Sequence, residues 1–430
     1  MLLVMLLEAK SEKFFARFTN RSNIAIALIA LFAGLLRFWR LAEPETLVFD
    51  EVYYVDGARD LLQYGVEIEG EKGEFVVHPP LGKWLIALSI LIFRDTSFSW
   101  RFSSALFGVA SVLLIYLIAK ELFSSHFIAI GAAFLLAIDG LAIVMSRTAL
   151  LDNFLTFFIL LSFYFLLKNK VVLMGISLGL AVAVKWSGGY YLAFFLGYLL
   201  IAFVSKRDWK NLTKTFAAVL LSFFIYLSSW IGWFNSKLSW SKESDPNPLI
   251  ALWNYHKEIY IFHSSLSVEH PYQSHPFSWL VMGRPTSFFY ESEVTCGNTE
   301  CAQEILALGN PALWWLGTIA LFSLIGYWIS RRDKVSGLIL LGFGAGYIPW
   351  FAFPERTMFT FYAISILPFL ILALGYLGNE LLLNRASAKR YLIAGFIVVF
   401  ILFLYFFPLY VGESITYDQW RQRMWLATWI

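Results

Sequence analysis

The feature that most constrains the fold is a series of long apolar segments, each close to the length of a membrane-crossing helix. A helix needs about 20 predominantly apolar residues to cross the hydrocarbon core. Eleven such segments occur, approximately at residues 22–40, 100–119, 126–145, 150–167, 171–186, 188–204, 215–234, 312–330, 336–353, 358–378 and 391–410. A twelfth piece, 84–93, has only ten residues, which favours an interfacial or re-entrant helix. We therefore expect an all-α integral membrane protein with about 11 transmembrane helices.

The composition supports this class and excludes others. Hydrophobic residues make up 59% of the chain and charged residues only 15%, which is too apolar for a soluble domain. A transmembrane β-barrel would show shorter segments of alternating polarity. The net charge of +3 is too small to indicate nucleic-acid binding, so membrane lipids and not nucleic acids are the expected surroundings.

Basic residues are concentrated in every second connection between the apolar segments. With the N-terminus inside, the inner segments hold 17 cations and 6 acids, beginning with Lys10, Lys13 and Arg17; the remainder holds 16 cations and 24 acids. This asymmetry matches the positive-inside rule, whereas counting 84–93 as a span would place basic loops outside. We predict a multi-pass plasma-membrane protein with a cytoplasmic N-terminus, an extracytoplasmic C-terminus and two long outer loops, 41–99 and 235–311.

Both cysteines lie in one polar stretch of the second outer loop, "TCGNTEC". A disulfide between Cys296 and Cys301 is favoured if that loop faces an oxidising compartment, and two free thiols are the alternative. The stretch contains no histidine, which argues against a zinc site.

Polar and ionisable residues gather at the outer ends of the predicted spans, in elements far apart in sequence. Charges near hydrocarbon are usually paired or functional. We interpret as donor and phosphate-binding residues Arg37, His78, Lys83, Arg101, Arg147, Asp152, Asn153, Lys185 and Arg356. Taken singly, the arginines could snorkel to headgroups and Asp152 could cap a helix. Together with adjacent carboxylates at Asp50 and Glu51 they predict a site that holds an anion and needs a base.

An outward-facing anion site in a membrane protein favours a lipid-linked phosphate as substrate. The stretch "HPPLGKW" at 78–84 precedes a helical run and suits a phosphate oxygen, but it lacks the glycine pattern of a nucleotide-binding loop. A polyprenyl-phosphate leaving group is already a stable anion, so it needs cations and a single carboxylate base. Direct displacement would invert the anomeric configuration. Asp56 and Asp60 are interpreted only as the solvated face of a short helix.

Several motifs resemble those of the protein O-mannosyltransferase family, which uses dolichyl- or polyprenyl-phosphate mannose. They are distributed from the first predicted span to near the tenth and read "FDEVYYVDGARDLL", "HPPLGKWLIAL", "RTALLDNFLTFF", "GLAVAVKWSGGYYL", "HPYQSHPFSWLVMGRP" and "PWFAFPERTMFTFYAISILPF". The resemblance implies a single GT-C-type membrane domain over 1–430, with eleven spans, juxtamembrane helices in the first outer loop and an extracytoplasmic active site. The second outer loop is too short for the β-trefoil insertion of eukaryotic members, so the chain is similar to the short prokaryotic branch.

The resemblance also assigns roles. It implies that Asp50 is the catalytic carboxylate, that Glu51 supports the site or positions the acceptor, and that His270 and Arg284 line the acceptor or donor groove. The implied reaction moves mannose from a polyprenyl-phosphate donor to Ser or Thr of exported proteins, with the secretion translocon as a place of encounter. A related transferase with another sugar or a lipid or glycan acceptor is the alternative, and a transporter is a more distant one. No cofactor is expected, although the adjacent carboxylates could ligate a divalent metal.

Overall fold

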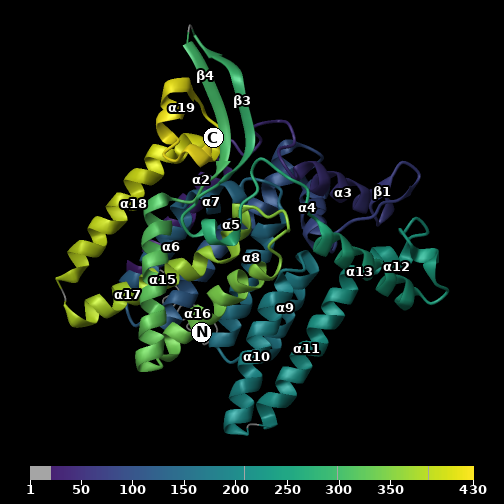
Figure 1. The fold of residues 1–430 in the computed structure, drawn as a ribbon, viewed down its shortest axis with the longest axis horizontal. Coiled ribbons are helices and arrows are strands. Elements are labelled where there is room, and N and C mark those ends of the chain that lie inside the picture. The colour runs from purple at the N-terminus through teal and green to yellow at the C-terminus, as the bar shows by residue number, and fades with distance from the viewer. Residues whose placement is uncertain (1–20, 208, 298, 386) are drawn as a thin grey trace, which may run out of the picture.

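The computed structural model describes residues 21–207, 209–297, 299–385 and 387–430. The first cations of the inner-loop count, Lys10, Lys13 and Arg17, lie outside the described residues. Apolar helices form the body of the molecule (Figure 1). In chain order they are α2 (Arg21–Phe38), α5 (Ser97–Leu122), α6 (His126–Ile138), α7 (Gly140–Ser146), α8 (Leu151–Leu167), α9 (Val171–Val184), α10 (Gly188–Lys206), α11 (Trp209–Ser229), α15 (Pro311–Arg331), α16 (Lys334–Tyr347), α17 (Leu367–Asn384) and α18 (Ala388–Val411).

Most helices overlap the predicted apolar segments, but the predicted segment 358–378 begins too early, because Thr360–Ser365 form a 3-10 helix and α17 starts at Leu367. The number of these helices that are spans is a separate question. By length and composition, seven of the described helices can each cross a membrane, or eight if α6 and α7, which meet at a 60° bend, form one span. The shorter apolar helices are α2, α8 and α9, which were predicted as spans, and α4 (Leu81–Phe93), which was not. The count of eleven therefore stays a prediction.

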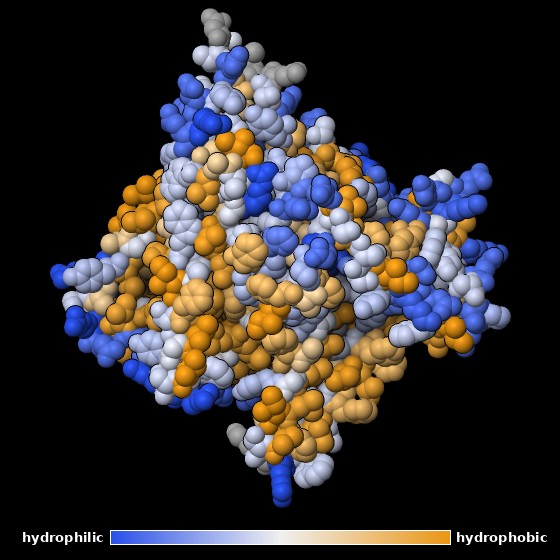
Figure 2. Space-filling view, viewed as in Figure 1, coloured by the Kyte–Doolittle hydropathy of each residue, from blue (hydrophilic) through white to orange (hydrophobic). Residues whose placement is uncertain are grey.

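The surface carries the apolar band that a bilayer requires. Figure 2 shows hydrophobic side chains across the middle and lower part of the visible face, with hydrophilic side chains at the top, at the right and at the lower left. Ile319 and Phe322 of α15 are more than 60% exposed, which is unfavourable in water and favourable against lipid. The exposed apolar side chains of the helical body are therefore suited to contact with lipid hydrocarbon.

Inside the bundle, small residues let helices approach closely. A side chain at Gly175 of α9 would place its Cβ 2.6 Å from the Cα of Ala218 on α11. At Gly179 the same test gives 2.8 Å to the Cα of Ser222, whose hydroxyl donates to the carbonyl of Gly175 at 2.7 Å. Glycine is therefore required where α9 meets α11, as is common for helices packed in membranes. One hydrophobic cluster of buried side chains extends from Ala33 to Trp429, so the apolar helices of the body share a core.

The outer loops carry their own short elements. The first contains α3 (Glu51–Tyr64), β1 (Ile68–Glu69), β2 (Lys72–Gly73) and α4. After α11 come α12 (Ile231–Asn235), η1 (Lys242–Ser244), α13 (Pro248–Ser265), α14 (Pro276–Trp279), β3 (Thr286–Cys296) and β4 (Thr299–Ala307). The predicted juxtamembrane helices of the first loop are α3 and α4. A second hydrophobic cluster, which includes Val66, Trp230, Trp233 and Tyr255, packs the first loop against α12 and α13.

A small antiparallel sheet, which was not predicted from the sequence, projects from the helical body (Figure 1). Its order is β3-β4-β5, where β5 (Ser414–Thr416) follows α18, so the C-terminal segment is tied to the second outer loop. Cys296 and Cys301 are disulfide-bonded near the tip of the β3–β4 hairpin, with Cα atoms 5.9 Å apart. The remaining short elements are η2 (Ile348–Ala352), η3 (Thr360–Ser365), α19 (Tyr417–Arg423) and η4 (Ala427–Trp429).

Candidate active site

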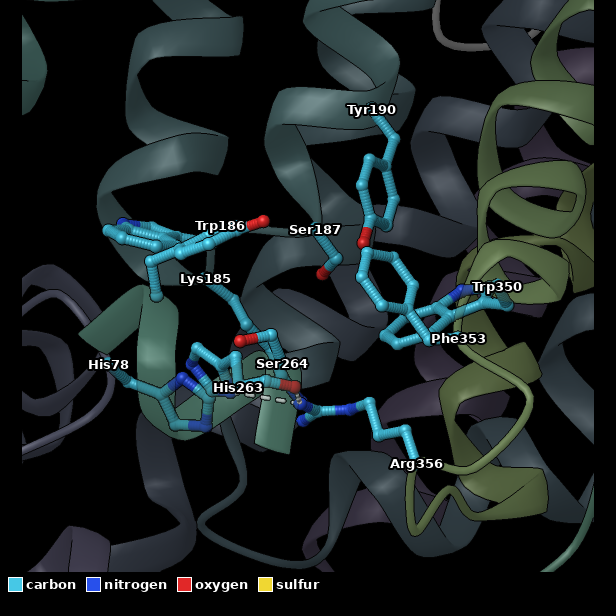
Figure 3. A pocket seen from close by; sticks show the side chains of 11 residues that line it. His78, Lys185, Trp186, Ser187, Tyr190, His263, Ser264, Trp350, Phe353 and Arg356 are labelled. Carbon is cyan, nitrogen blue, oxygen red and sulfur yellow. Dashed lines mark hydrogen bonds between the residues drawn. The ribbon is translucent and has the colours of Figure 1, made fainter. Parts of the chain in front are cut away.

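Two adjoining cavities lie where the first outer loop meets α10, α13 and the segment after η2. They share His78, His263 and Arg356 in their walls. The first, about 210 Å³, is called the aromatic cavity and is lined by His78, Lys185, Trp186, Ser187, Tyr190, Tyr260, His263, Ser264, Trp350, Phe353 and Arg356 (Figure 3). The second, about 710 Å³, is called the acidic cavity because five of its lining residues are Asp50, Asp56, Asp60, Glu67 and Glu74.

Asp50 lines the acidic cavity at the start of α3. It occupies the N-cap position, yet its side chain makes no capping hydrogen bond. The Tyr54 hydroxyl lies within hydrogen-bonding reach of its carboxylate, which forms no ion pair among the described residues. Phe49 before it has a φ of +48°, a conformation that bulky residues rarely adopt, and its ring stacks on Phe288 at 4.7 Å. Burial raises the pKa of Asp50 to about 6, partly offset by the charge of Lys185. A carboxylate of this kind is mostly ionised at neutral pH and basic enough to accept a proton.

Glu51, the adjacent acid, has a different environment. It is fully buried, and both its oxygens are bound by the guanidinium of Arg101 at 2.8 Å. It also accepts from the backbone N–H of Val48 at 3.0 Å and of Ala149 at 2.8 Å. Arg101 donates in addition to the carbonyl of Pro44 at 2.8 Å. The pair therefore connects the loop before α3 to α5 and to the turn before α8. Both oxygens of the Glu51 carboxylate already accept hydrogen bonds from these groups.

Lys185 and Asp152 form a second buried pair, at the wall of the aromatic cavity. The Lys185 ammonium lies 2.9 Å from both carboxylate oxygens of Asp152 and 4.4 Å from the ring centre of Tyr362. Lys185 directly follows α9, and Asp152 lies in the first turn of α8, so two apolar helices position this pair. The pair is neutral overall, but it fixes the position of the Lys185 ammonium at the cavity wall before any ligand binds.

Arg356 and two histidines form the boundary between the cavities. Arg356 donates to the backbone carbonyl of His263 and approaches its Nδ1 at 3.2 Å, while Nε2 of His263 bonds the carbonyl of Val77 at 2.9 Å. The rings of His78 and His263 stack with centres 5.4 Å apart. Burial and nearby cations lower the pKa of both imidazoles, that of His263 to about 4, so both are neutral at pH 7. Figure 3 shows these groups facing Tyr190, Trp350 and Phe353 across the aromatic cavity.

Lys83 lines the acidic cavity but is already paired. It forms a buried ion pair with Glu67, and both side chains are about 4% exposed. Gly57 of α3 makes room for this pair, because a Cβ there would lie 2.5 Å from Oε2 of Glu67. Lys83 therefore stabilises the hairpin against α3 and α4, in place of the free phosphate ligand suggested by "HPPLGKW".

Three further predicted donor residues bind other parts of the protein. Arg37 is buried and donates to the carbonyls of Ala33, Leu136 and Ala137, at the bend between α6 and α7. Arg147 donates to backbone carbonyls at the end of α2, and Asn153 donates to the carbonyl of Ser104 at 2.7 Å. Among the described residues, the walls of the two cavities do not include these three. Their contacts support the shape of the site.

The two residues predicted in the second outer loop also lie outside the cavity walls. His270 contacts the rings of Phe49 and Phe359. Arg284 donates to the carbonyls of Pro271 and Thr428 and to the main-chain oxygen of Ile430. His270 thus supports the residue before Asp50, and Arg284 fastens the C-terminal segment.

Sequence reasoning missed several residues that build the site. His263, Tyr190, Trp350, Glu67 and Glu74 all line a cavity. The aromatic residues gave no signal because 19% of the chain is aromatic. His263 was recognisable only as one of six histidines, of which His78 and His263 line the two cavities in the described structure.

Comparison with known proteins then decides the family. Residues 27–238 match the family described as dolichyl-phosphate-mannose-protein mannosyltransferase, and residues 248–429 match the C-terminal four-transmembrane region of protein-O-mannosyltransferase. A polyprenol-phosphate-mannose–protein mannosyltransferase of Mycobacterium tuberculosis is 30% identical over 95% of this chain and 92% of its own. One from Corynebacterium glutamicum is 31% identical over 96% and 94%. The chain belongs to the protein O-mannosyltransferase family.

Solved structures agree with the fold expected for this family. The Saccharomyces cerevisiae Pmt1–Pmt2 protein O-mannosyltransferase complex bound to the sugar donor has a TM-score of 0.79, at 17% identity over 96% of this chain and 93% of that one. ArnT from Cupriavidus metallidurans bound to undecaprenyl phosphate has a TM-score of 0.55, at 16% identity over 82% and 60%. The expected GT-C-type glycosyltransferase fold of a protein O-mannosyltransferase is confirmed.

Proposed function

We propose that this protein transfers mannose from polyprenyl-phosphate mannose to serine and threonine hydroxyls of exported proteins. The curated relatives that align over nearly the whole chain are polyprenol-phosphate-mannose–protein mannosyltransferases. The observation that carries the proposal is the junction of the two cavities. A free carboxylate of raised pKa lies on one side, and fixed cations next to an apolar cavity lie on the other.

Asp50 is the base in this mechanism. The acceptor hydroxyl enters through the acidic cavity, and its oxygen attacks C1 of the mannosyl group as Asp50 accepts the proton. The bond from C1 to the phosphate oxygen breaks, and its electron pair leaves with the phosphate. Because attack and departure occur on opposite faces of the sugar, the anomeric configuration inverts. No general acid is required, since the leaving phosphate is a stable anion.

Lys185 and Arg356 stabilise that leaving phosphate. Both line the aromatic cavity, and the Nε of Arg356 is buried with no hydrogen-bond partner in the described part of the chain. Cations fixed where charge develops lower the barrier more than mobile ones, because no reorganisation is needed during the reaction. The neighbouring aromatic side chains suit the first apolar units of a polyprenyl chain. With this charge in place the reaction requires no cofactor or divalent metal.

The proposal includes the membrane and the side of the membrane at which the enzyme acts. The site faces the extracytoplasmic side of the cell membrane, with the N-terminus cytoplasmic, and acceptors are met as they emerge from the secretion translocon. The positive-inside charge distribution and the shared side of the outer-loop elements support this arrangement.

The test is transfer by the purified full-length protein. The enzyme in lipid nanodiscs is incubated with polyprenyl-phosphate mannose and a Ser/Thr peptide, and mannosyl peptide is measured by mass spectrometry. Product with wild-type protein and none with Asp50→Asn is the expected result. Polyprenyl-phosphate glucose and galactosamine are run in parallel. Transfer of either in place of mannose would replace the proposed donor, and full activity of Asp50→Asn would refute the base assignment.

A further inference from the structure

Besides Asp50, the acidic cavity is lined by four acids, Asp56, Asp60, Glu67 and Glu74, which have no role in the proposed transfer mechanism. Two of its acids are neutralised, Glu67 by Lys83 and Asp56 by Arg59 at 2.6 Å. Asp60 and Glu74 form no ion pair among the described residues. Burial raises the pKa of both carboxyls, and neighbouring acids raise both further, whereas the charge of Lys83 lowers both and the backbone N–H of Ile68 lowers that of Asp60. The two groups therefore lie in a region where a positive charge would be favourable.

These acids are arranged along one line from the base. Asp50, Tyr53, Gly57 and Asp60 follow each other at helical spacing, and all of them line the acidic cavity. Ten residues along α3 correspond to about 15 Å. Glu74, from the strand-like segment after β2, closes the same cavity from the other side. The cavity is therefore lined from Asp50 to Asp60 and Glu74, and the part at Asp60 and Glu74 is called the acidic mouth.

A second observation points to a ligand in this cavity. The imidazole of His78 lines it, and its Nδ1 atom is buried with no hydrogen-bond partner among the described residues. A buried polar atom without a partner costs free energy that a bound ligand can recover. Because the imidazole is neutral, Nδ1 can accept from a hydroxyl or backbone N–H of an acceptor segment that enters beside Asp50.

The charges also differ between the two ends of the joined cavities. Arg356 and Lys185 lie toward the aromatic cavity, where the donor phosphate is expected, whereas Asp60 and Glu74 lie at the far end. The acidic mouth repels the donor phosphate and attracts a cation. A positively charged side chain on the acceptor would therefore fix where the acceptor binds and which way its chain runs through the cavity.

We propose that the acidic cavity binds the acceptor polypeptide in extended form, with a lysine or arginine held at Asp60 and Glu74. At about 3.3 Å per residue, the distance of about 15 Å from Asp50 corresponds to four or five residues. The inference rests on the proposed function and adds to it an acceptor preference. Segments with a basic residue four or five positions from the modified serine or threonine are used in preference to acidic ones.

The experiment compares matched peptides with the full-length enzyme in nanodiscs. Each peptide has one threonine and either Lys, Gln or Glu four or five positions away, on the N- or the C-terminal side, and kcat/KM is measured with polyprenyl-phosphate mannose. We expect the Lys peptide to exceed the Glu peptide by about five- to twentyfold at low salt, and less at high salt. The double variant Asp60→Asn/Glu74→Gln should reduce that ratio to near one, mainly by lowering kcat/KM for the Lys peptide.

Glu71→Gln is the matched control, because Glu71 is exposed in the β1–β2 turn and does not line the cavity. It should keep the full Lys preference. Transfer to the Gln peptide establishes the proposed function on its own, so equal rates for Lys and Glu peptides would overturn only the acceptor preference. A preference that survives the double variant would overturn the assignment to Asp60 and Glu74. Absence of transfer to every peptide would overturn both proposals.

Discussion

Arg101 of α5 binds both carboxylate oxygens of Glu51 at 2.8 Å, and the two side chains are at most 1% exposed. Asp50, one residue earlier, has no such partner and faces the acidic cavity. The two adjacent acids are therefore not interchangeable. One joins the outer loop to the helical bundle, and the other remains available for chemistry.

Glu51→Gln is expected to destabilise the protein, because Arg101 loses its buried counter-charge. Breaking one side of a buried pair typically costs about 3–5 kcal/mol. Thermal unfolding of the purified protein measures this, with Asp50→Asn as the matched control that should keep the wild-type melting temperature. A double variant, Glu51→Leu with Arg101→Met, should recover only part of the loss, because the N–H groups of Val48 and Ala149 and the carbonyl of Pro44 then lack their partners. Equal melting temperatures for Glu51→Gln and wild type would contradict the structural role.

Lys185→Met is expected to lose both stability and transfer, because it leaves the carboxylate of Asp152 buried without a cation. Pairing it with Asp152→Asn removes the uncompensated charge, so stability should return. Transfer should stay at least about 100-fold reduced, since the charge facing the leaving phosphate is still absent. Melting temperatures and transfer rates of the single and double variants test this. Recovery of transfer in the double variant would exclude a role for Lys185 in the reaction.

Transfer is expected to depend on pH through Asp50. Burial holds the pKa of its carboxyl near 6, above the ordinary value, and only the ionised form accepts a proton. kcat/KM should therefore fall about tenfold per pH unit below about pH 6 and level off above it. His263, with a pKa near 4, stays neutral through this window. Initial rates between about pH 5 and 8 test the assignment, and a flat profile across that range would argue against Asp50 as the base.

The orientation can be tested by cysteine labelling in intact cells. The chain has two cysteines, and both are in the disulfide, so background labelling should be low. Glu71→Cys, in the first outer loop, should react with a membrane-impermeant maleimide. Lys334→Cys, at the start of α16, should react only after the cells are opened. The reverse pattern would invert the predicted topology.

The apolar helices of a multi-pass membrane protein were readable from sequence because their cause is local. A span is a continuous apolar segment, and its orientation follows from cations a few residues away. The β3-β4-β5 sheet was missed, since β3 and β4 lie in a polar loop with two register irregularities and β5 is a three-residue strand about 110 residues later. No local sequence pattern predicts that two strands so far apart in sequence will pair.

The candidate site was predicted in part, for a similar reason. Sequence placed the ionisable residues at one membrane depth, and the structure brings Asp50, His78, Lys83, Lys185 and Arg356 to the walls of the joined cavities. Sequence reasoning could not distinguish these cavity residues from Arg37 and Arg147, which are also cationic and also lie at the outer ends of predicted spans. Their partners are backbone carbonyls from other helices, and only the packed bundle shows which carbonyls are within reach.

The sequence by itself determined that this is a membrane protein of the mannosyltransferase family with adjacent carboxylates outside the bilayer. Only the tertiary structure decided which carboxylate is free. Successive side chains at the start of a helix point about 100° apart, so Asp50 and Glu51 cannot face the same surroundings. The side chain of Glu51 points toward α5 and the turn before α8, which bind it. The side chain of Asp50 lines the acidic cavity instead.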